Sequence, residues 1–212
     1  MEGYVELCER VRNIIINKGY VLQMEYNNGI YNFNIYDNNN VICNLQITNT
    51  VGNILVGKTR SRYQNKMEDH NIFKISWVYT QPNYRGNKLA LLLIIYSICY
   101  LKIQYPNINY VTLDDDSDNS IYIKNIYNSV GFNFQEPIEM DLLKSNRLKI
   151  SGPEKQLLID NVFLINIHAM LNTKHSRNKT LKPKTLKPKT LKLKTLKPKT
   201  LRKNIEKKPK NK

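Results

Sequence analysis

The sequence predicts an α/β domain with a mixed, mostly antiparallel sheet around a central parallel β-α-β pair, followed by a disordered basic tail. Alternating apolar and polar residues joined by Asn- and Gly-rich turns fill 20–48, which is typical of an antiparallel meander. Strand-like and helix-like patterns then alternate from 71 to 136, as in a parallel β-α-β unit. The segment 172–212 holds 17 of the 33 Lys and Arg residues but 1 of the 17 acidic residues.

The first half of the chain is predicted to form one helix and four strands. The N-terminal helix should stop at Gly19, because apolar residues recur at helical spacing before it: Val5, Cys8, Val11, Ile15 and Ile16. Three strands follow at 20–26, 30–36 and 41–48. The polar and charged residues of 49–70 predict a loop with at most one short strand, at Asn53–Gly57. The run 71–80 is a strong strand that Pro82 ends, since proline cannot donate to a β ladder.

The second half begins with a predicted helix at 85–104 that is apolar on all sides, as expected of a helix buried against the sheet. It leads to a strand at 108–114, and a helix that links two neighbouring strands predicts a parallel pair. A further helix runs from 117 to Gly131, whose glycine ends it, and 132–137 begins another strand. The apolar runs of 137–171 predict additional sheet or a covering helix without deciding between them.

Cysteine usage and hydropathy predict a soluble intracellular protein, cytoplasmic or nuclear. The cysteines are odd in number, widely separated and without Cys-x-x-Cys spacing, so we expect neither a disulfide framework nor a metal site. The most apolar run, Leu89–Leu101, is shorter than the roughly 18–20 residues that a membrane span requires, so no membrane partner is expected. The acidic, amphipathic N-terminus does not resemble a secretory signal.

The basic tail is predicted to be a separate unit. Residues 1–171 have balanced charge and form the predicted domain, whereas 172–212 carry the whole formal charge of +16. Within the tail, 179–203 repeats five pentads of the KTLKP type, and proline in three of them forbids a continuous helix. We therefore expect a disordered Lys-rich segment that contacts nucleic acid or another polyanion in a salt-sensitive way. A solubilising tail and a nuclear-localisation signal are the alternatives.

The junction between the 71–80 strand and the next helix has the features of an anion site. It reads TQPNYRGNKLA, from Thr80 to Ala90. Gly86 allows a close approach of the backbone to a ligand, and Arg85 and Lys88 add positive charge. The first N–H groups of a helix have no partner within the helix, and the helix dipole makes that end electropositive. The loop is therefore predicted to bind a pyrophosphate.

This stretch resembles the acetyl-coenzyme-A loop of the GCN5-related N-acetyltransferase (GNAT) superfamily, whose pattern is Arg/Gln-x-x-Gly-x-Gly/Ala after a V-x-P-x-Y-R-G lead-in. A second family element matches Asn119-Ser120 at a helix start and the closing IYNSVGF, which contains Tyr127. The resemblance covers about 71–136. One departure is Lys88, which stands where the family has the middle glycine. Its side chain would either crowd the pyrophosphate or contact a phosphate directly.

The resemblance implies a GNAT-like fold and an acetyl-CoA-dependent N-acetyltransferase acting on an amine of a protein, a peptide or a small molecule. Tyr127 would be the catalytic acid that protonates the leaving thiolate, and a backbone amide near Tyr79 would stabilise the oxyanion. Acetyl-CoA would be bound by the strand end Val78, Tyr79 and Thr80, by the loop Arg85, Gly86, Asn87, Lys88, Leu89 and Ala90, and by Asn119 and Ser120.

The general base has several candidates, which flank the 71–80 strand or end the 108–114 strand: Glu68, Asp69, His70, Asp114, Asp115 and Asp116. A carboxylate there would attract a cationic acceptor such as lysine or a polyamine. The alternatives are solvated loop acids or a helix N-cap at Asp118. Trp77 is expected in the core rather than in a substrate cage, and His168 and His175 are expected to be incidental. A catalytically weak acyl-CoA-binding protein and a polyanion attachment module that acts through the tail stay open as other functions.

Overall fold

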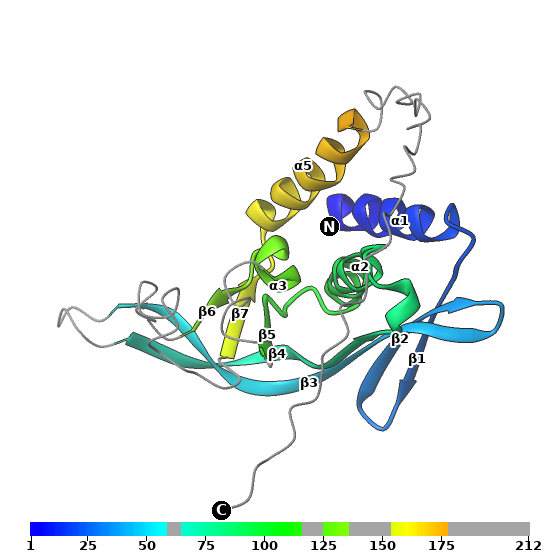
Figure 1. The fold of residues 1–212 in the computed structure, drawn as a ribbon. Coiled ribbons are helices and arrows are strands. Elements are labelled where there is room, and N and C mark those ends of the chain that lie inside the picture. The colour runs from blue at the N-terminus through cyan, green and yellow to red at the C-terminus, as the bar shows by residue number, and fades with distance from the viewer. Residues whose placement is uncertain (59–64, 116–124, 136–153, 178–212) are drawn as a thin grey trace, which may run out of the picture.

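A single mixed sheet organises the described part of the chain. The computed structural model describes residues 1–58, 65–115, 125–135 and 154–177 (Figure 1). The strands lie in the order β1-β2-β3-β4-β5-β7-β6; β4 and β5 are parallel, and the other neighbours are antiparallel. Their bounds are β1 Val21–Asn27, β2 Ile30–Asp37, β3 Asn40–Lys58, β4 Asn65–Thr80, β5 Tyr110–Asp114, β6 Asn133–Phe134 and β7 Glu154–Leu158. The predicted fold class, with its meander and its central parallel pair, is confirmed.

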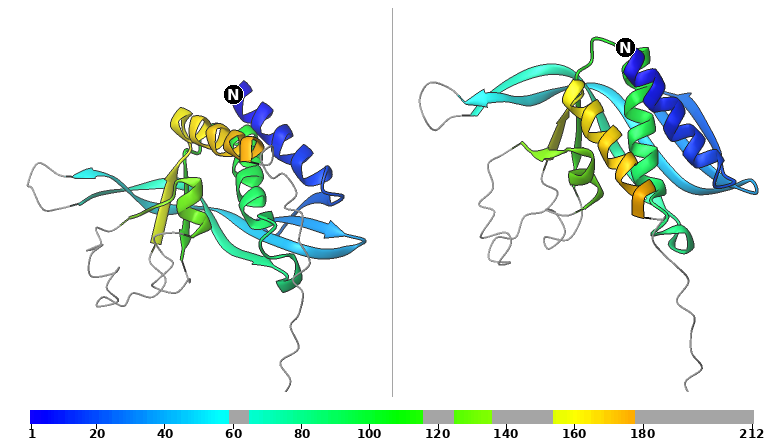
Figure 2. Two further views of the ribbon diagram at one scale, coloured as in Figure 1. Left: turned by 45° about the horizontal axis from the view of Figure 1, so that its top comes forward. Right: turned by 90° about the horizontal axis from the view of Figure 1, so that it is seen from above.

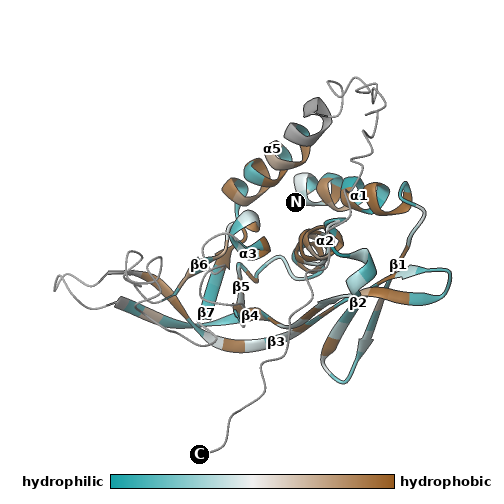
Figure 3. Cartoon of the chain, in the orientation of Figure 1, coloured by the Kyte–Doolittle hydropathy of each residue, from teal (hydrophilic) through white to brown (hydrophobic). Residues whose placement is uncertain are grey.

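The described helices lie on one side of this sheet (Figures 1 and 2). They are α1 Glu2–Ile16, α2 Leu89–Gln104, α3 Ile126–Val130 and α5 Asn161–Arg177. Figure 3 shows that α2 is apolar around its circumference, and Leu93, Ile94 and Ile95 have no exposed surface. The prediction of a buried helix is thus confirmed. Among the described helices, none is both long enough and apolar enough to cross a membrane.

The N-terminal helix is confirmed, but its predicted buried face was partly wrong. The residues of α1 that face the core are Tyr4, Leu7, Val11 and Ile15, whereas Val5 and Ile16 are exposed. Tyr4 was not in the predicted set. In the structure its ring stacks on Phe163 of α5, and the hydroxyl donates to the Asp160 carbonyl at 3.0 Å.

The loop predicted for 49–70 is wrong, because β3 and β4 form a long hairpin there. Their register continues from Cys43↔Thr80 out to Lys58↔Asn65. Most of the side chains in this arm are polar, so its alternation is weak, but Ile54 and Ile72 are buried. Gly52 makes room for Ile72, since a Cβ at Gly52 would lie 2.4 Å from the Ile72 Cδ1. The arm is fixed to β7 by Gln156, whose side chain bonds the N–H and C=O of Leu55 at 2.9 Å each.

The undecided region after 137 contributes both a strand and a helix. β7 lies between β5 and β6 and is antiparallel to each. α5 continues through Arg177, past the predicted domain end at 171. The KTLKP pentads of 179–203 lie outside the described residues, as do Asp116, Asp118, Asn119 and Ser120. Cys8 is half-buried, Cys43 and Cys99 are buried, and all three are free thiols.

Candidate functional site

β4 and β5 separate at the middle of the sheet. They pair at Phe73↔Val111, Lys74↔Thr112 and Ile75↔Leu113, after which β4 stays paired only with β3, as far as Thr80. Ser76 falls between the register pairs Gln46↔Trp77 and Ile47↔Ile75, so a β-bulge sits where the strands diverge. The gap contains a pocket of about 260 Å³, called here the β4–β5 cleft, lined by Ile75, Ser76, Trp77, Val78, Leu113, Asp114 and Tyr127.

The end of β4 presents backbone groups to this cleft. The Gln81 N–H donates to the Ile42 carbonyl at 2.9 Å, on the β3 side. Because successive residues of a strand point their N–H and C=O groups to opposite edges, those of Tyr79 face β3 and those of Val78 and Thr80 face the open side. The Thr80 carbonyl accepts from the Arg85 Nε at 3.2 Å. Val78 and Thr80 are therefore the predicted strand-end residues whose backbone faces away from β3, and of the two Val78 lines the cleft.

The loop after β4 has a fixed shape. A short 3-10 turn, Pro82–Tyr84, is tied to the β2–β3 hairpin, because the Tyr84 hydroxyl donates to the Asp37 Oδ2 at 2.7 Å. Gly86 and Lys88 both have left-handed backbones, with φ of 85° and 63°. Since a right-handed helix cannot contain such residues, α2 begins at Leu89 and the predicted start at 85 is wrong. Lys88 keeps a backbone conformation that glycine favours, although it carries a side chain.

The first turn of α2 offers unbonded amides. The Arg85 N–H donates to the Pro82 carbonyl at 3.2 Å. Within the described part of the chain, the backbone N–H groups of 86–91 donate no hydrogen bond, and the first helical bond runs from Leu92 N–H to the Lys88 carbonyl. Leu89 is buried in the core, so only its backbone is available. These amides and the helix dipole make this end of α2 suited to an anion.

Tyr127 is held on the other side of the cleft by buried polar groups that the sequence did not reveal. Asn125 caps α3: its side chain accepts from the N–H groups of Tyr127 and Asn128 at 3.1 and 3.3 Å, and donates to Asp115 at 2.6 Å. Asp115 forms a 2.5 Å ion pair with Lys155 of β7, and neither side chain is exposed. The Lys155 Nζ also donates to the Asn128 Oδ1 at 3.0 Å.

Electrostatics agree with this arrangement. Burial lowers the pKa of the Lys155 ammonium, and the ion pair with Asp115 opposes that shift.

Gly131 ends α3 with a φ of 112°, as predicted. Lys155 was missed because no local pattern links a strand residue to a helix so far before it in the chain.

The candidate bases fall in different environments. Asp114 lines the cleft, where it is half-exposed and forms a 2.9 Å ion pair with Lys74. Asp115 is buried and already paired with Lys155. Glu68 pairs with Lys66 in the hairpin arm, where it lies opposite Ile54 in the register. Asp114 is thus the candidate carboxylate that the structure brings to Tyr127.

Trp77 lies in a different place from the one predicted, whereas His168 lies away from the cleft. Trp77 was expected in the core, but it is 55% exposed and lines the cleft. The β-bulge beside it turns Ser76 and Trp77 together toward solvent, which an alternating pattern does not predict. His168 lies away from the cleft lining and contacts Arg10, with 3.3 Å between its Nδ1 and the guanidinium.

Comparisons with known proteins find structural likeness only. No protein-family model matches the sequence, and no curated protein matches it. A bacterial toxin is similar at 14% identity over 70% of this chain and 74% of its own, with a TM-score of 0.45. An acetyltransferase of the GNAT family from Streptococcus pneumoniae is similar at 15% identity over 63% and 69%, with a TM-score of 0.41. A mutant AtaT toxin bound to acetyl-CoA and the C-terminus of the antitoxin AtaR is similar at 7% identity over 64% and 72%, with a TM-score of 0.42.

TM-scores below 0.5 and identities of 15% or less say nothing about activity. The sheet of this chain carries the structural conclusion by itself. One parallel pair diverges beside a loop that leads into a buried helix, and the short helix α3 carries Tyr127 in its first turn and ends at Gly131. These are the features that the sequence resemblance implied, at the positions it implied, and the described chain has a GNAT-like fold.

Proposed function

We propose that this chain is an acetyl-CoA-dependent N-acetyltransferase that transfers the acetyl group directly to an amine. The observation that supports this most strongly is the β4–β5 cleft, which has Val78 and Tyr127 in its lining, while the loop that follows β4 leads to the unbonded amides of 86–91. Acetyl-CoA has a thioester, a long polar arm and a diphosphate in that order, which matches the order of Tyr127, the β4 edge and the amides of 86–91. The backbone edge at Val78 and Thr80 suits an extended amide chain, and the amides of 86–91 suit the diphosphate.

The side chains of the cleft supply the proton transfers. Acetyl-CoA, as the co-substrate, brings the acetyl thioester. Asp114 accepts a proton from the acceptor ammonium, which frees the nitrogen lone pair to form a bond to the thioester carbonyl carbon. As the carbon–sulfur bond breaks, the Tyr127 phenol donates its proton to the sulfur. The new amide nitrogen loses its second proton to solvent and the Tyr127 phenolate takes one back, so the products are an N-acetyl amide and a free thiol.

The cleft also indicates the kind of acceptor. Trp77 is exposed and lines the cleft together with Asp114, and both kinds of group attract a cation. We therefore propose a primary ammonium on a flexible chain, in a protein, a peptide or a small amine, as the acceptor. In the free protein Lys74 forms an ion pair with Asp114, and an acceptor ammonium would compete with Lys74 for the carboxylate.

Calorimetry with acetyl-CoA on the full chain tests the cofactor, and a thiol-release assay across a panel of amines tests the reaction. We expect saturable binding at micromolar concentrations and thiol release that depends on the amine; the matching N-acetylated amines serve as controls. Absence of binding at high micromolar acetyl-CoA would exclude both the enzyme and the acyl-CoA-binding alternative. Binding without thiol release from any amine would favour the binding protein. The remaining alternative, attachment to a polyanion, would depend on the basic segment 172–212.

A further inference from the structure

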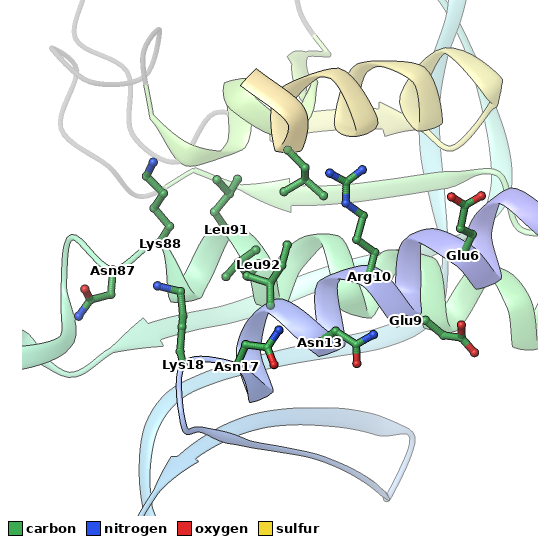
Figure 4. Close-up of a pocket in the computed structure, with 12 residues that line it drawn as sticks. Glu6, Glu9, Arg10, Asn13, Asn17, Lys18, Asn87, Lys88, Leu91 and Leu92 are labelled. Carbon is green, nitrogen blue, oxygen red and sulfur yellow. The ribbon is translucent and has the colours of Figure 1, made fainter. Parts of the chain in front are cut away.

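β1 is the first strand of the sheet, and its outer edge is open in the described part of the chain. β2 is the one described strand that pairs with it. Asn17 and Lys18, which lead from α1 to β1, line a cavity of about 740 Å³ between α1 and the start of α2 (Figure 4). None of the residues that line this cavity belongs to β1, so the edge of β1 is a separate surface.

The β1–β2 register determines which backbone groups face the open side. The turn Asn28-Gly29 has φ angles of 50° and 81°, as in a two-residue type I′ hairpin. The residues that flank such a turn, Asn27 and Ile30, bond each other, and bonded pairs then alternate along the strand. The residues whose N–H and C=O groups face away from β2 are therefore Leu22, Met24 and Tyr26. No other residue of the described chain forms a hydrogen bond with these groups.

This edge lacks the features that usually keep edge strands from pairing with another chain. Such strands are commonly very short, or they carry proline, lysine or a β-bulge. β1 has seven residues, VLQMEYN, of which only Glu25 is charged, and its register with β2 has no shift. β6, at the other end of the strand order, has two residues in the described chain. Val21 and Tyr26 of β1 are 54% and 61% exposed. The β1 edge is therefore suited to receive another strand.

Two copies of β1 complement each other when they run antiparallel with Met24 opposite the partner's Met24. All seven residues of the strand then pair. On the face where Leu22 and Met24 pack against the core, Leu22 lies opposite the partner's Tyr26. On the other face, Gln23 lies opposite the partner's Glu25, so each carboxylate meets an amide donor. The outward N–H and C=O groups of the two strands can form about six hydrogen bonds.

Other registers of the same two strands fit less well. A shift of one residue would place outward-facing backbone groups opposite inward-facing ones, because the two kinds alternate along a strand. A shift of two residues in one direction would place Glu25 opposite the partner's Glu25. The same shift in the other direction would place Glu25 opposite the partner's Val21. Charge and overlap therefore both favour the register that is centred on Met24.

We propose that β1 pairs antiparallel with β1 of a second copy, so that the protein forms a two-fold symmetric dimer with one sheet continuous across both chains. The proposal does not depend on the proposed function. A seven-residue edge makes a small interface, so we expect a weak dimer with a micromolar Kd. The formal charge of +16 on each chain opposes association, and salt screens that repulsion.

Sedimentation velocity of the full chain, over about 1–200 µM in about 0.3 M salt, measures the dimer. We expect a monomer–dimer equilibrium in this range. Gln23→Glu places two carboxylates opposite each other at both ends of the pairing, so it should raise Kd by about tenfold. Adding Glu25→Gln to that variant exchanges the two groups and should restore the wild-type Kd. Val51→Glu adds the same charge at an exposed position of the hairpin arm and should leave Kd unchanged.

Met24→Pro tests the backbone pairing separately, because it removes an N–H that faces away from β2. It should abolish the dimer and leave the circular dichroism spectrum of the monomer unchanged. A wild-type protein that stays monomeric over the whole range would overturn the proposal and leave the edge to a strand of another protein. A dimer that neither Gln23→Glu nor Met24→Pro weakens would use another surface and would equally overturn it. If the double variant stayed as weak as Gln23→Glu, the register centred on Met24 would be wrong.

Discussion

The two walls of the β4–β5 cleft are constructed differently. On the β4 side, one continuous stretch from Ile75 to Lys88 supplies backbone groups, and its loop is largely exposed. On the α3 side, Tyr127 depends on buried side chains from β5, α3 and β7 that meet in one network around Asp115 and Lys155. We therefore expect the first wall to tolerate more changes in side chain identity than the second, which should fail when a single partner is lost.

The largest effect should come from breaking the buried pair. Lys155→Met leaves the Asp115 carboxylate buried without its cation, which costs about 3–5 kcal/mol of unfolding free energy. Chemical denaturation of the full chain, followed by circular dichroism, measures this loss. Lys74→Met breaks the exposed pair with the adjacent Asp114 and should change stability by less than about 1 kcal/mol.

A variant that fails to fold still leaves this comparison open to a test. Replacing both members, with Lys155→Met and Asp115→Leu together, removes the buried charge and should recover most of the lost stability. Equal losses from Lys155→Met and Lys74→Met would show that the two walls do not differ in the way described. A double variant no more stable than Lys155→Met would show that the carboxylate is not what destabilises the single variant.

The next effect concerns what the α3 wall does in the reaction. Tyr127→Phe keeps the ring, which packs edge-on against Phe132 with 6.2 Å between centroids, and removes the acidic hydroxyl. Loss of general-acid catalysis should lower kcat by about 100-fold, equivalent to about 2.7 kcal/mol of barrier. The thiol-release assay measures the rate, and calorimetry should show acetyl-CoA affinity within about threefold of wild type. An unchanged kcat would remove Tyr127 from the proposed role.

What the sequence could predict follows the same division. The β4 wall came from local signals, because Pro82, Gly86 and the apolar run after Lys88 mark a strand, a turn and a buried helix in order. Tyr127 came from its motif. The network that positions Tyr127 could not be found, because Lys155 reaches it from β7 only after the sheet has formed. Local sequence patterns can predict a wall built from one stretch of backbone. A wall built from side chains distant in sequence can be recognised only in the folded structure.

The errors have equally physical causes. The hairpin arm at 49–70 was predicted as loop because polar residues on both faces of a strand hide its alternation, and only Gly52 and Ile72 mark the packing inside it. Trp77 was assigned to the core from its size and apolar character, whereas the bulge at Ser76 turns it outward. A bulge changes the phase of a strand, so every inference from alternation fails beyond it.

The smallest effect concerns the β4 wall, where two left-handed residues in one loop differ in kind. Gly86 suits its φ of 85°, whereas Lys88 holds a φ of 63° with a β-carbon present. Lys88→Gly removes a strain of about 1–2 kcal/mol but adds unfolded-state entropy, so we expect a net gain of about 0.5–1 kcal/mol in cofactor-free unfolding free energy. Gly86→Ala is the matched control: a Cβ there meets nothing within 4 Å, so only backbone strain acts and stability should fall by about 1 kcal/mol. Chemical denaturation of both variants gives the comparison. Opposite signs are expected because one change removes strain from the loop and the other adds it. If Lys88→Gly destabilised the free protein, the lysine side chain would be holding the loop, and the β4 wall would depend on side chains as the α3 wall does.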